Sequence, residues 1–381
     1  MTLFQDAPGD PRTATAQLAD VLALYGAIGD AAYGNPPGFA LRKASTAVSL
    51  ARSVQLEPLE CDAIYFAGIL HAVGAIGSAA FRKGAQLSPR LARMESWDVP
   101  ALGARACAQI GALPSATADI VRWQAECWDG TGYPDQLRWQ GVPASAMVLA
   151  LADAFVRASD PDEALIRVGE QSGRAYGPDL AGEFSKWYYL RGGEAPALQP
   201  PPLESLRTPS FDDARNLLES IADRVDAHNA VEGRWRRVER LTAACATILH
   251  LDAQTSRSLA QGVRVYGAGE VADADSERFD ALLRLGIDQR AKHALAAAAL
   301  LESKAAFSGA AELVRARAEW YDGTGKPNGL RREAIPAGAR LLAAAIAYDS
   351  LDQKDRIVDA IGTQFEPHAV AAVTEAARAL A

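Results

Sequence analysis

The sequence has few cysteines, and they form no pattern that binds metal or builds a disulfide framework. The four cysteines are scattered without a CxxC pair, which argues against both a zinc knuckle and a disulfide-stabilised fold and fits a reducing cytoplasm. Long apolar runs are also missing, because no stretch approaches the ~20 uncharged residues of a membrane span. The segment from Met1 to Arg12 has acidic residues and proline where a signal peptide has a basic start and an apolar run. We therefore expect a soluble, cytoplasmic protein.

Positive charge is scarce as well. The formal net charge is -8 and the isoelectric point is about 5.3, whereas nucleic-acid binding needs a concentrated positive surface. We expect no nucleic-acid partner, although a local basic patch is compatible with these values. With 381 residues, the chain is long enough for two domains that each bury their own core.

Alternating β-branched runs bounded by turns are absent, and a helical period takes their place. In the segment around residue 150, apolar residues recur at the spacing i, i+3, i+4, i+7, i+8 of an amphipathic helix. These residues are Met147, Ala150, Leu151, Ala154 and Phe155. Proline precedes this segment at Pro143 and a similar one at Pro336, a residue that suits the start of a helix. The pattern predicts an all-α fold.

The chain repeats itself. The heptapeptide WDGTGYP at 128–134 returns as YDGTGKP at 321–327, an offset of 193 (322 minus 129). Internal self-similarity over a whole domain indicates tandem structural units. Further upstream, Gly38 matches Gly233 if two residues are deleted between the matching helices. We expect two copies of one helical domain.

A proline- and glycine-rich stretch separates the copies. It has no apolar periodicity and is typical of a stiff, extended linker. We predict copy one at residues 1–191, the linker at residues 192–211 and copy two at residues 212–381. The sequence leaves open how the copies pack and whether the chain forms a homodimer through its alanine-rich helices.

Several motifs resemble those of one protein family. Glu126 to Pro134 resembles the HD-GYP signature HHExxDGxGYP, and Leu70 to Gly77 resembles LHDxGKxG of the same family. The resemblance implies two tandem HD-GYP-like helical bundles. Members are bacterial phosphodiesterases that act on cyclic di-GMP with two or three iron or manganese ions, held by histidines and carboxylates. Such ligands suit these metals, which generate hydroxide and neutralise the phosphodiester.

Most of the family's metal ligands are replaced in copy one. Only His71 and Asp153 remain, as vestigial metal-site positions, and either could instead be a core residue bonded to a neighbour. We therefore expect no metal, no cofactor and no catalytic residue. The residues that replace ligands are Phe39, Ala72, Val99, Gln124 and Ala125, and Ala75 replaces the lysine that the resemblance implies assists catalysis.

Copy two has lost its ligands differently. Arg234, Arg264 and Arg317 stand at three former histidine positions, and Ile346 replaces the aspartate. The guanidinium fork matches carboxylate and phosphate, so such a cluster requires an anionic partner. Internal pairing, with Glu319 or Asp349 as candidate carboxylates, is one interpretation. The other is a bound anion such as a nucleotide phosphate.

The DGTG-x-P loop persists in both copies and has two interpretations. Asp-Gly and Thr-Gly supply turn chemistry, so a conserved turn explains much of it. In copy one the loop is flanked by aromatic residues, which are common at protein-binding hot spots. The resemblance implies a GGDEF-domain cyclase as a candidate partner. The candidate docking residues are Trp128, Asp129, Gly130, Thr131, Gly132, Tyr133 and Pro134.

These observations lead to one main functional hypothesis. We expect a catalytically inactive member of the family, not an enzyme, that acts as a protein-interaction or regulatory module in bacterial signalling related to cyclic di-GMP. One alternative is a sensor of anionic nucleotides that uses the arginines of copy two. Another is a weak metal-dependent phosphodiesterase that uses His71 and Asp153.

Overall fold

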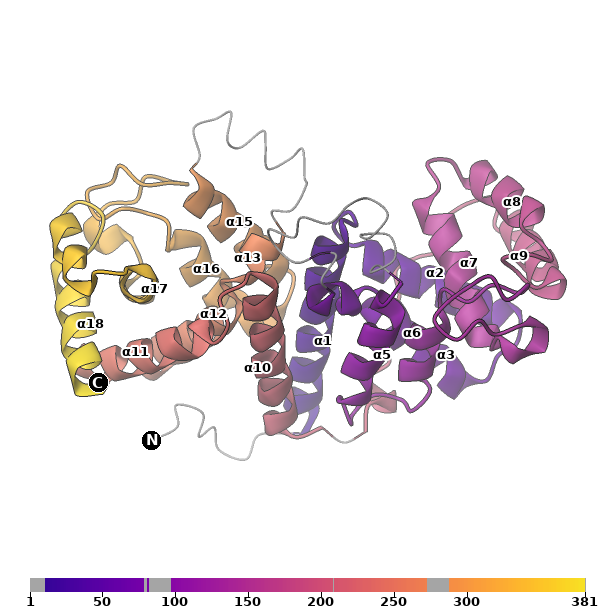
Figure 1. Cartoon of the computed structure of the whole chain (residues 1–381), viewed down its shortest axis with the longest axis horizontal. Coiled ribbons are helices and arrows are strands. Elements are labelled where there is room, and N and C mark those ends of the chain that lie inside the picture. The colour runs from indigo at the N-terminus through magenta and orange to yellow at the C-terminus, as the bar shows by residue number, and fades with distance from the viewer. Residues whose placement is uncertain (1–10, 79–80, 82–96, 208, 273–287, 381) are drawn as a thin grey trace. The chain divides into compact units, whose positions relative to one another are not determined.

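The chain is helical throughout the part that the computed structural model describes, namely residues 11–78, 81, 97–207, 209–272 and 288–380 (Figure 1). Within these ranges there is no β-strand. Isolated bridges join Ser172 to Tyr176 and Ile361 to Phe365. The predicted all-α fold is confirmed. None of the described helices combines the length and apolar character needed to cross a bilayer.

The predicted apolar stripe lies on α7 (Ala144–Arg157), which begins directly after Pro143. Four of its five members, all except Ala150, are buried. Ala150 instead lines a pocket in copy one. Residues off the stripe, such as Val148 and Leu149, are buried too, so the core surrounds most of α7 and leaves Ala150 and Asp153 at the pocket.

The chain divides into two compact units at Leu217 and Leu218, inside α10 (Phe211–His228). The predicted linker lies on copy one. The Gln199 backbone N–H donates to Ser45 Oγ at 2.9 Å, and the Arg207 N–H donates to the Ala112 carbonyl oxygen at 2.9 Å. The described residues between 192 and 217 thus belong to the same unit as copy one.

The two copies share an order of elements. In both, the second long helix packs against the third and against the helix that follows the DGTG-x-P loop. Copy one consists of α1 (Pro11–Tyr33), α2 (Phe39–Ser53), α3 (Pro58–Leu70), η1 (Val73–Gly77), α5 (Val99–Ala108), α6 (Thr117–Trp123), η3 (Trp139–Gly141), α7, α8 (Pro161–Glu170) and α9 (Pro178–Leu190), followed by η4 (Leu203–Ser205). Copy two consists of α10 from Leu218 onward, α11 (Arg234–Ile248), α12 (Ala253–Val265), α13 (Ala268–Val271), α15 (Gln289–Leu301), η5 (Ala305–Phe307), α16 (Ser308–Ala316), η6 (Arg332–Ala334), α17 (Ala337–Ser350), η7 (Lys354–Ala360) and α18 (Pro367–Leu380).

The repeat extends to hydrogen bonds at the start of α2 and α11. Gly38 and Gly233 precede these helices with φ of 75° and 71°, a conformation that glycine adopts without steric penalty. Asp30 Oδ2 accepts from the Ala40 N–H, and Asp226 Oδ2 accepts from the Trp235 N–H, each at 2.8 Å. One buried carboxylate therefore satisfies a free N–H in the first turn of each helix.

Candidate functional site

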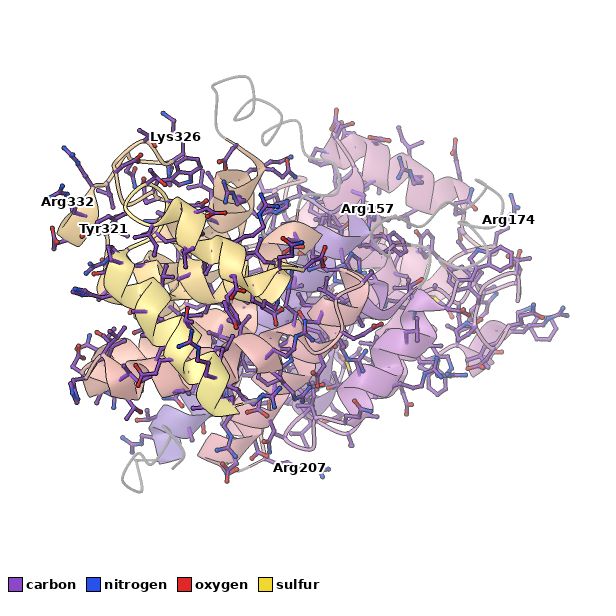
Figure 2. All side chains as sticks on the ribbon, turned by 60° about the vertical axis from the view of Figure 1, so that its left-hand side comes forward. Arg157, Arg174, Arg207, Tyr321, Lys326 and Arg332 are labelled. Carbon is purple, nitrogen blue, oxygen red and sulfur yellow. The ribbon has the colours of Figure 1, made fainter. Side chains whose placement is uncertain are left out.

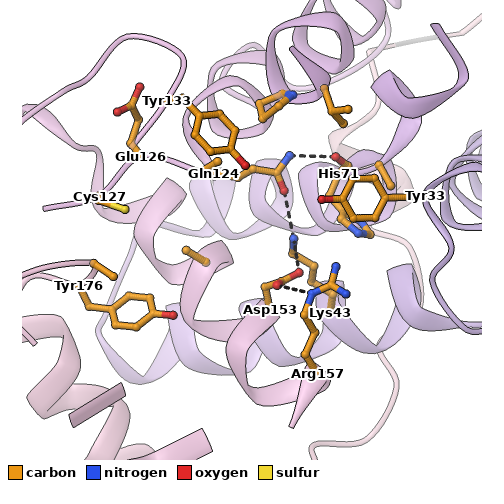
Figure 3. Close-up of a pocket in the computed structure, with 16 residues that line it drawn as sticks. Tyr33, Lys43, His71, Gln124, Glu126, Cys127, Tyr133, Asp153, Arg157 and Tyr176 are labelled. Atoms are coloured by element: carbon orange, nitrogen blue, oxygen red, sulfur yellow. Dashed lines mark hydrogen bonds and ion pairs between the residues drawn. The ribbon is translucent and has the colours of Figure 1, made fainter. Parts of the chain in front are cut away.

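A pocket of about 400 Å³ lies in copy one, where α2, the end of α3 and α7 approach the DGTG-x-P loop (Figure 3). It occupies the region of the positions that correspond to the family's metal ligands. Its polar lining combines cations, one carboxylate on α7 and aromatic hydroxyls. The polar lining residues are Tyr33, Lys43, His71, Gln124, Glu126, Tyr133, Asp153, Arg157 and Tyr176.

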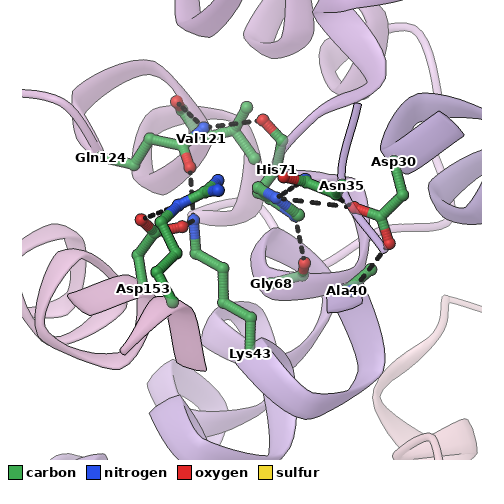
Figure 4. Close-up of polar contacts among 10 residues, drawn as sticks. Asp30, Asn35, Ala40, Lys43, Gly68, His71, Val121, Gln124 and Asp153 are labelled. Carbon is green, nitrogen blue, oxygen red and sulfur yellow. Dashed lines mark hydrogen bonds and ion pairs between the residues drawn. The ribbon is translucent and has the colours of Figure 1, made fainter. Parts of the chain in front are cut away.

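A buried ion pair forms the floor of the pocket (Figure 4). Lys43 Nζ lies 3.0 Å from Asp153 Oδ1 and donates to Gln124 Oε1 at 3.0 Å. The Lys43 side chain is only 3% exposed. Gln124 is fixed in turn, because its Nε2 donates to the carbonyl oxygens of His71 and Val121. An ammonium group thus occupies the centre of this polar cluster.

A second cation reaches Asp153 from the next turn of α7. Arg157 Nε lies 2.6 Å from Asp153 Oδ2, and the Arg157 guanidinium covers the Phe39 ring at 4.5 Å. Burial by itself would raise the pKa of Asp153, but the charges of Lys43 and Arg157 outweigh it and hold that pKa well below its usual value. Asp153 is therefore an ionised carboxylate between two cations.

His71 faces away from Asp153. Its Nδ1 lies 2.9 Å from the Gly68 carbonyl oxygen, and its Nε2 lies 3.2 Å from Asn35 Nδ2. Burial, and then the charge of Lys43, lower the pKa of His71 well below its usual value. A neutral ring that donates from Nδ1 and accepts at Nε2 satisfies both contacts. The two surviving family positions are thus engaged with different neighbours.

These donors do not fit a metal cluster. Among the described residues, no group of three or more histidine, cysteine, aspartate or glutamate side chains could hold a metal ion. Asp153 is already bound by Lys43 and Arg157, and a cation placed beside it would meet the Lys43 ammonium at close range. The iron or manganese that the family implies therefore has no donor set in the pocket as described.

Sequence inspection missed Lys43, Arg157 and Asp30. Lys43 and Arg157 each carried a usable signal, since each lies four residues after a position that was singled out, Phe39 and Asp153 respectively. Residues at i and i+4 share a helix face. Asp30 had no such signal: its burial raises its pKa to about 6, and this burial depends on the packing of α1.

The DGTG-x-P loop has the same internal hydrogen bonds in both copies. Asp129 Oδ1 accepts from the Thr131 N–H at 3.0 Å, and Asp322 Oδ1 accepts from the Thr324 N–H at 2.8 Å. Glu126 accepts from two backbone N–H groups directly after the loop, those of Asp135 and Leu137. The glutamate that the family places after its histidine pair therefore fastens the loop in this protein.

Most aromatic residues of the loop in copy one face inward. Tyr133 lines the pocket and stacks on Trp97, with ring centroids 5.8 Å apart, and Trp128 is half-buried. Trp139 is the exception, at 56% exposed. In copy two Lys326 replaces the tyrosine and is exposed at the surface (Figure 2). The docking role of the loop stays a prediction.

The arginines of copy two have partners other than the two carboxylates named from the sequence. Arg234 pairs with Glu270 at 2.8 Å. Arg264 pairs with Glu219 at 3.1 Å and Glu239 at 2.6 Å. No ion pair joins Arg317 to a carboxylate among the residues that the structure describes.

The two carboxylates named from the sequence serve other groups. Glu319 accepts from the backbone N–H groups of Asn328 and Leu330. Asp349 pairs with Arg237 at 2.7 Å. The expected pairing of Glu319 or Asp349 with the three arginines is therefore not found, because packing turns both carboxylates toward other donors.

Two curated proteins resemble parts of this chain. A cyclic di-GMP phosphodiesterase of Vibrio cholerae is 30% identical over 149 residues, which are 37% of this chain and 27% of that protein. A cyclic di-GMP phosphodiesterase of Thermotoga maritima is 28% identical over 137 residues, which are 32% of this chain and 36% of that protein. The matched regions are therefore only about a third of these relatives' own length.

A solved structure shares the fold over nearly the whole chain. It is the cyclic GMP-AMP specific phosphodiesterase V-cGAP3 of V. cholerae, with a TM-score of 0.65 and 18% identity, covering 95% of this chain and 97% of that one. At this identity the likeness shows the fold alone. The shared fold therefore extends over both tandem copies of this chain.

The expectation that this chain is not an enzyme is contradicted by these comparisons. Both curated relatives and the solved neighbour bear the name of phosphodiesterases. The expectation rested on the replacement of metal ligands.

A family profile matches the chain in two segments. The HD domain family matches residues 30–171 and residues 216–366, one segment in each copy. The matches cover most of the chain and contain both DGTG-x-P loops and every helix that lines the pocket except the first part of α1. The chain belongs to the HD domain family, with two tandem copies of the HD-GYP type.

Proposed function

We propose that this protein is a cyclic-dinucleotide phosphodiesterase that binds the phosphodiester of its substrate in the pocket of copy one. The observation that carries the proposal is the placement of Lys43 and Arg157 around Asp153 at the floor of this pocket. The names of the curated relatives support the substrate class.

The pocket has the groups that a nucleotide phosphodiester needs. The Arg157 side chain is 36% exposed, so it can turn from Asp153 toward a ligand, and its planar fork matches phosphate oxygens. Tyr33, Tyr133 and Tyr176 line the same cavity. Aromatic faces of this kind stack on nucleobases. One side of the cavity can thus hold phosphate and another a base.

Side-chain charges support the chemical step. A cation held beside the scissile phosphate stabilises charge that develops in the transition state. Lys43 is fixed by Asp153 and Gln124 and supplies such a charge without moving. Water forms the new P–O bond as the P–O bond to a ribose oxygen breaks, and that oxygen leaves with a proton. Asp153 is a weak acceptor for the proton of the attacking water because its pKa is held low. We therefore expect slow turnover.

The test uses the full chain with cyclic di-GMP and with cyclic GMP-AMP, measuring binding by calorimetry and linear product by chromatography. We expect saturable binding and slow product formation. Arg157→Met should weaken binding about tenfold, whereas Arg167→Met, which removes an exposed arginine of α8 outside the pocket, should not. Binding without any product would reject hydrolysis but support the pocket as a binding site. Absence of binding would reject both parts of the proposal.

One observation favours a second function, contact with a protein partner. Trp139 is 56% exposed, and exposed tryptophan is a common anchor at interfaces. A GGDEF-domain cyclase is the partner that we propose for this surface. Titration of such a domain against the wild-type chain and Trp139→Ala tests it, with loss of affinity expected in the variant.

A further inference from the structure

Copy two contains a cluster of cationic side chains that is separate from the pocket of copy one. Arg317, at the end of α16, stands where copy one has Gln124 (317 minus 193). Its Nε is buried and has no hydrogen-bond acceptor within the described ranges. A buried charge without a partner is costly, so proteins seldom retain one. Arg317 therefore requires an explanation.

Two arginines lie on the same tyrosine ring. The Cζ atoms of Arg317 and Arg234 lie 5.6 and 5.2 Å from the centre of the Tyr266 ring. Tyr266 is 1% exposed, and its hydroxyl has no hydrogen-bond partner among the described residues. Arg234 Nε is likewise buried without an acceptor there. Donors from three side chains thus converge around one ring and lack acceptors.

The charges of this cluster are unbalanced. Glu270 pairs with Arg234 at 2.8 Å, and Asp226 lies 3.9 Å from the same guanidinium. Arg290 adds a further positive charge near Arg317. Burial, together with the charges of Arg234 and Arg290, lowers the pKa of Arg317 to about 10. The guanidinium is still protonated at neutral pH, so the cluster favours an anion.

Arg264 belongs to a different set of contacts. Its guanidinium lies over the Trp235 ring at 5.5 Å and pairs with Glu219 and Glu239. The three arginines that stand at former histidine positions therefore do not act as one group. Arg317 and Arg234 are the two arginines around Tyr266 whose buried Nε atoms lack a hydrogen-bond acceptor among the described residues.

We propose that copy two binds a phosphate anion, either free phosphate or the phosphate of a nucleotide, between Arg317 and Arg234 beside the Tyr266 hydroxyl. Arg317 is only half-buried, so its outer nitrogens are within reach of such a ligand. Two guanidinium forks and a hydroxyl supply the donors that phosphate oxygens accept. This site is independent of the function proposed for copy one.

The first test titrates the full chain with inorganic phosphate in chloride buffer at constant ionic strength. Binding is followed by calorimetry and by the ¹⁵Nε signal of Arg317, which is assigned from its loss in Arg317→Met. We expect saturable binding with a Kd on the order of 1 mM or tighter.

Guanosine monophosphate is the second ligand. Binding about tenfold tighter than that of phosphate identifies a nucleotide site, and equal binding identifies a phosphate site. Absence of saturation with both overturns the proposal without any variant.

Variants give the second test. Arg317→Met should weaken phosphate binding at least about tenfold, whereas Arg356→Met should not. The control removes the same charge from an arginine that is 70% exposed in copy two. Without phosphate, Arg317→Met should unfold at a higher temperature than wild type, because it removes a guanidinium whose Nε is buried without an acceptor among the described residues. A lower unfolding temperature combined with unchanged phosphate binding would show that Arg317 is structural and overturn the proposal.

Discussion

Lys43 and Asp153 form an ion pair in copy one, with Nζ and Oδ1 separated by 3.0 Å. In copy two the corresponding positions are Val238 (offset 195, from Gly233 minus Gly38) and Ile346 (offset 193). Val238 is completely buried. The two copies thus place a charge pair and an apolar pair at the same location between the second helix and the helix that follows the loop.

Replacement of one partner of this pair should destabilise copy one, and replacement of both should not. Lys43→Val leaves the Asp153 carboxylate with Arg157 as its remaining cation and should cost about 2 kcal/mol of unfolding free energy. Lys43→Val combined with Asp153→Ile copies the residues of copy two and should lie within about 1 kcal/mol of wild type. Urea unfolding of the four proteins in this cycle measures the coupling. Additive losses would show that the two side chains do not interact.

The contribution of Asp30 to the stability of copy one should fall as pH rises between about 4 and 6, against the opposite contribution of His71, whose lowered pKa favours the folded state more as pH rises. Burial raises the pKa of Asp30 to about 6 from its usual value of 3.8. The folded state therefore binds a proton more tightly than the unfolded state does, and deprotonation across this window should remove about 2 to 3 kcal/mol. Hydrogen exchange of α1 and α2 amides reports copy one separately.

The control for this pH dependence uses two variants. Asp30→Asn cannot titrate and should remove the Asp30 contribution from the pH profile of α1 and α2 exchange, so that the variant gains stability relative to wild type as pH rises through this window. Asp179→Asn, at an exposed position of α9, should leave the profile of wild type. A profile for Asp30→Asn that matches wild type would assign the titration to another group.

Gly132 should not tolerate alanine. A Cβ atom at this position would lie 2.2 Å from the Cys127 backbone nitrogen and 2.5 Å from Glu126 Cα, so backbone atoms would have to move. We expect Gly132→Ala to lower the unfolding free energy by about 2 kcal/mol. Gly141→Ala is the matched control, because a Cβ there meets no atom within 4 Å. Equal thermal stability of the two variants would contradict this explanation.

Glu126 and Glu319 should have equal structural roles. Each carboxylate accepts from two backbone N–H groups directly after its loop, and a carboxylate is a stronger acceptor than an amide. We expect Glu126→Gln and Glu319→Gln each to cost about 1 to 3 kcal/mol, as measured by exchange of the loop amides. A loss confined to one copy would show that the loops are held differently.

Part of the site was predictable from sequence, and part was not. His71, Gln124 and Asp153 were identified because each stands at a position of a motif, and all three line the pocket. Lys43 matches no motif position. Its burial and its contact with Asp153 arise only when α2 packs against α7, a contact that neither helix encodes alone.

The sequence by itself determined the helices, the repeat and the two loops. These depend on a local apolar period, on turn residues and on glycines at fixed places, and each acts over a few neighbouring residues. The tertiary structure decided which charges meet. Lys43 and Asp153 are 110 residues apart in the sequence (153 minus 43). Arg264 pairs with Glu219 and Glu239 and not with the carboxylates that the sequence indicated. Ion pairs between helices depend on how the helices pack, because a side chain can only pair with the groups that packing brings within about 4 Å.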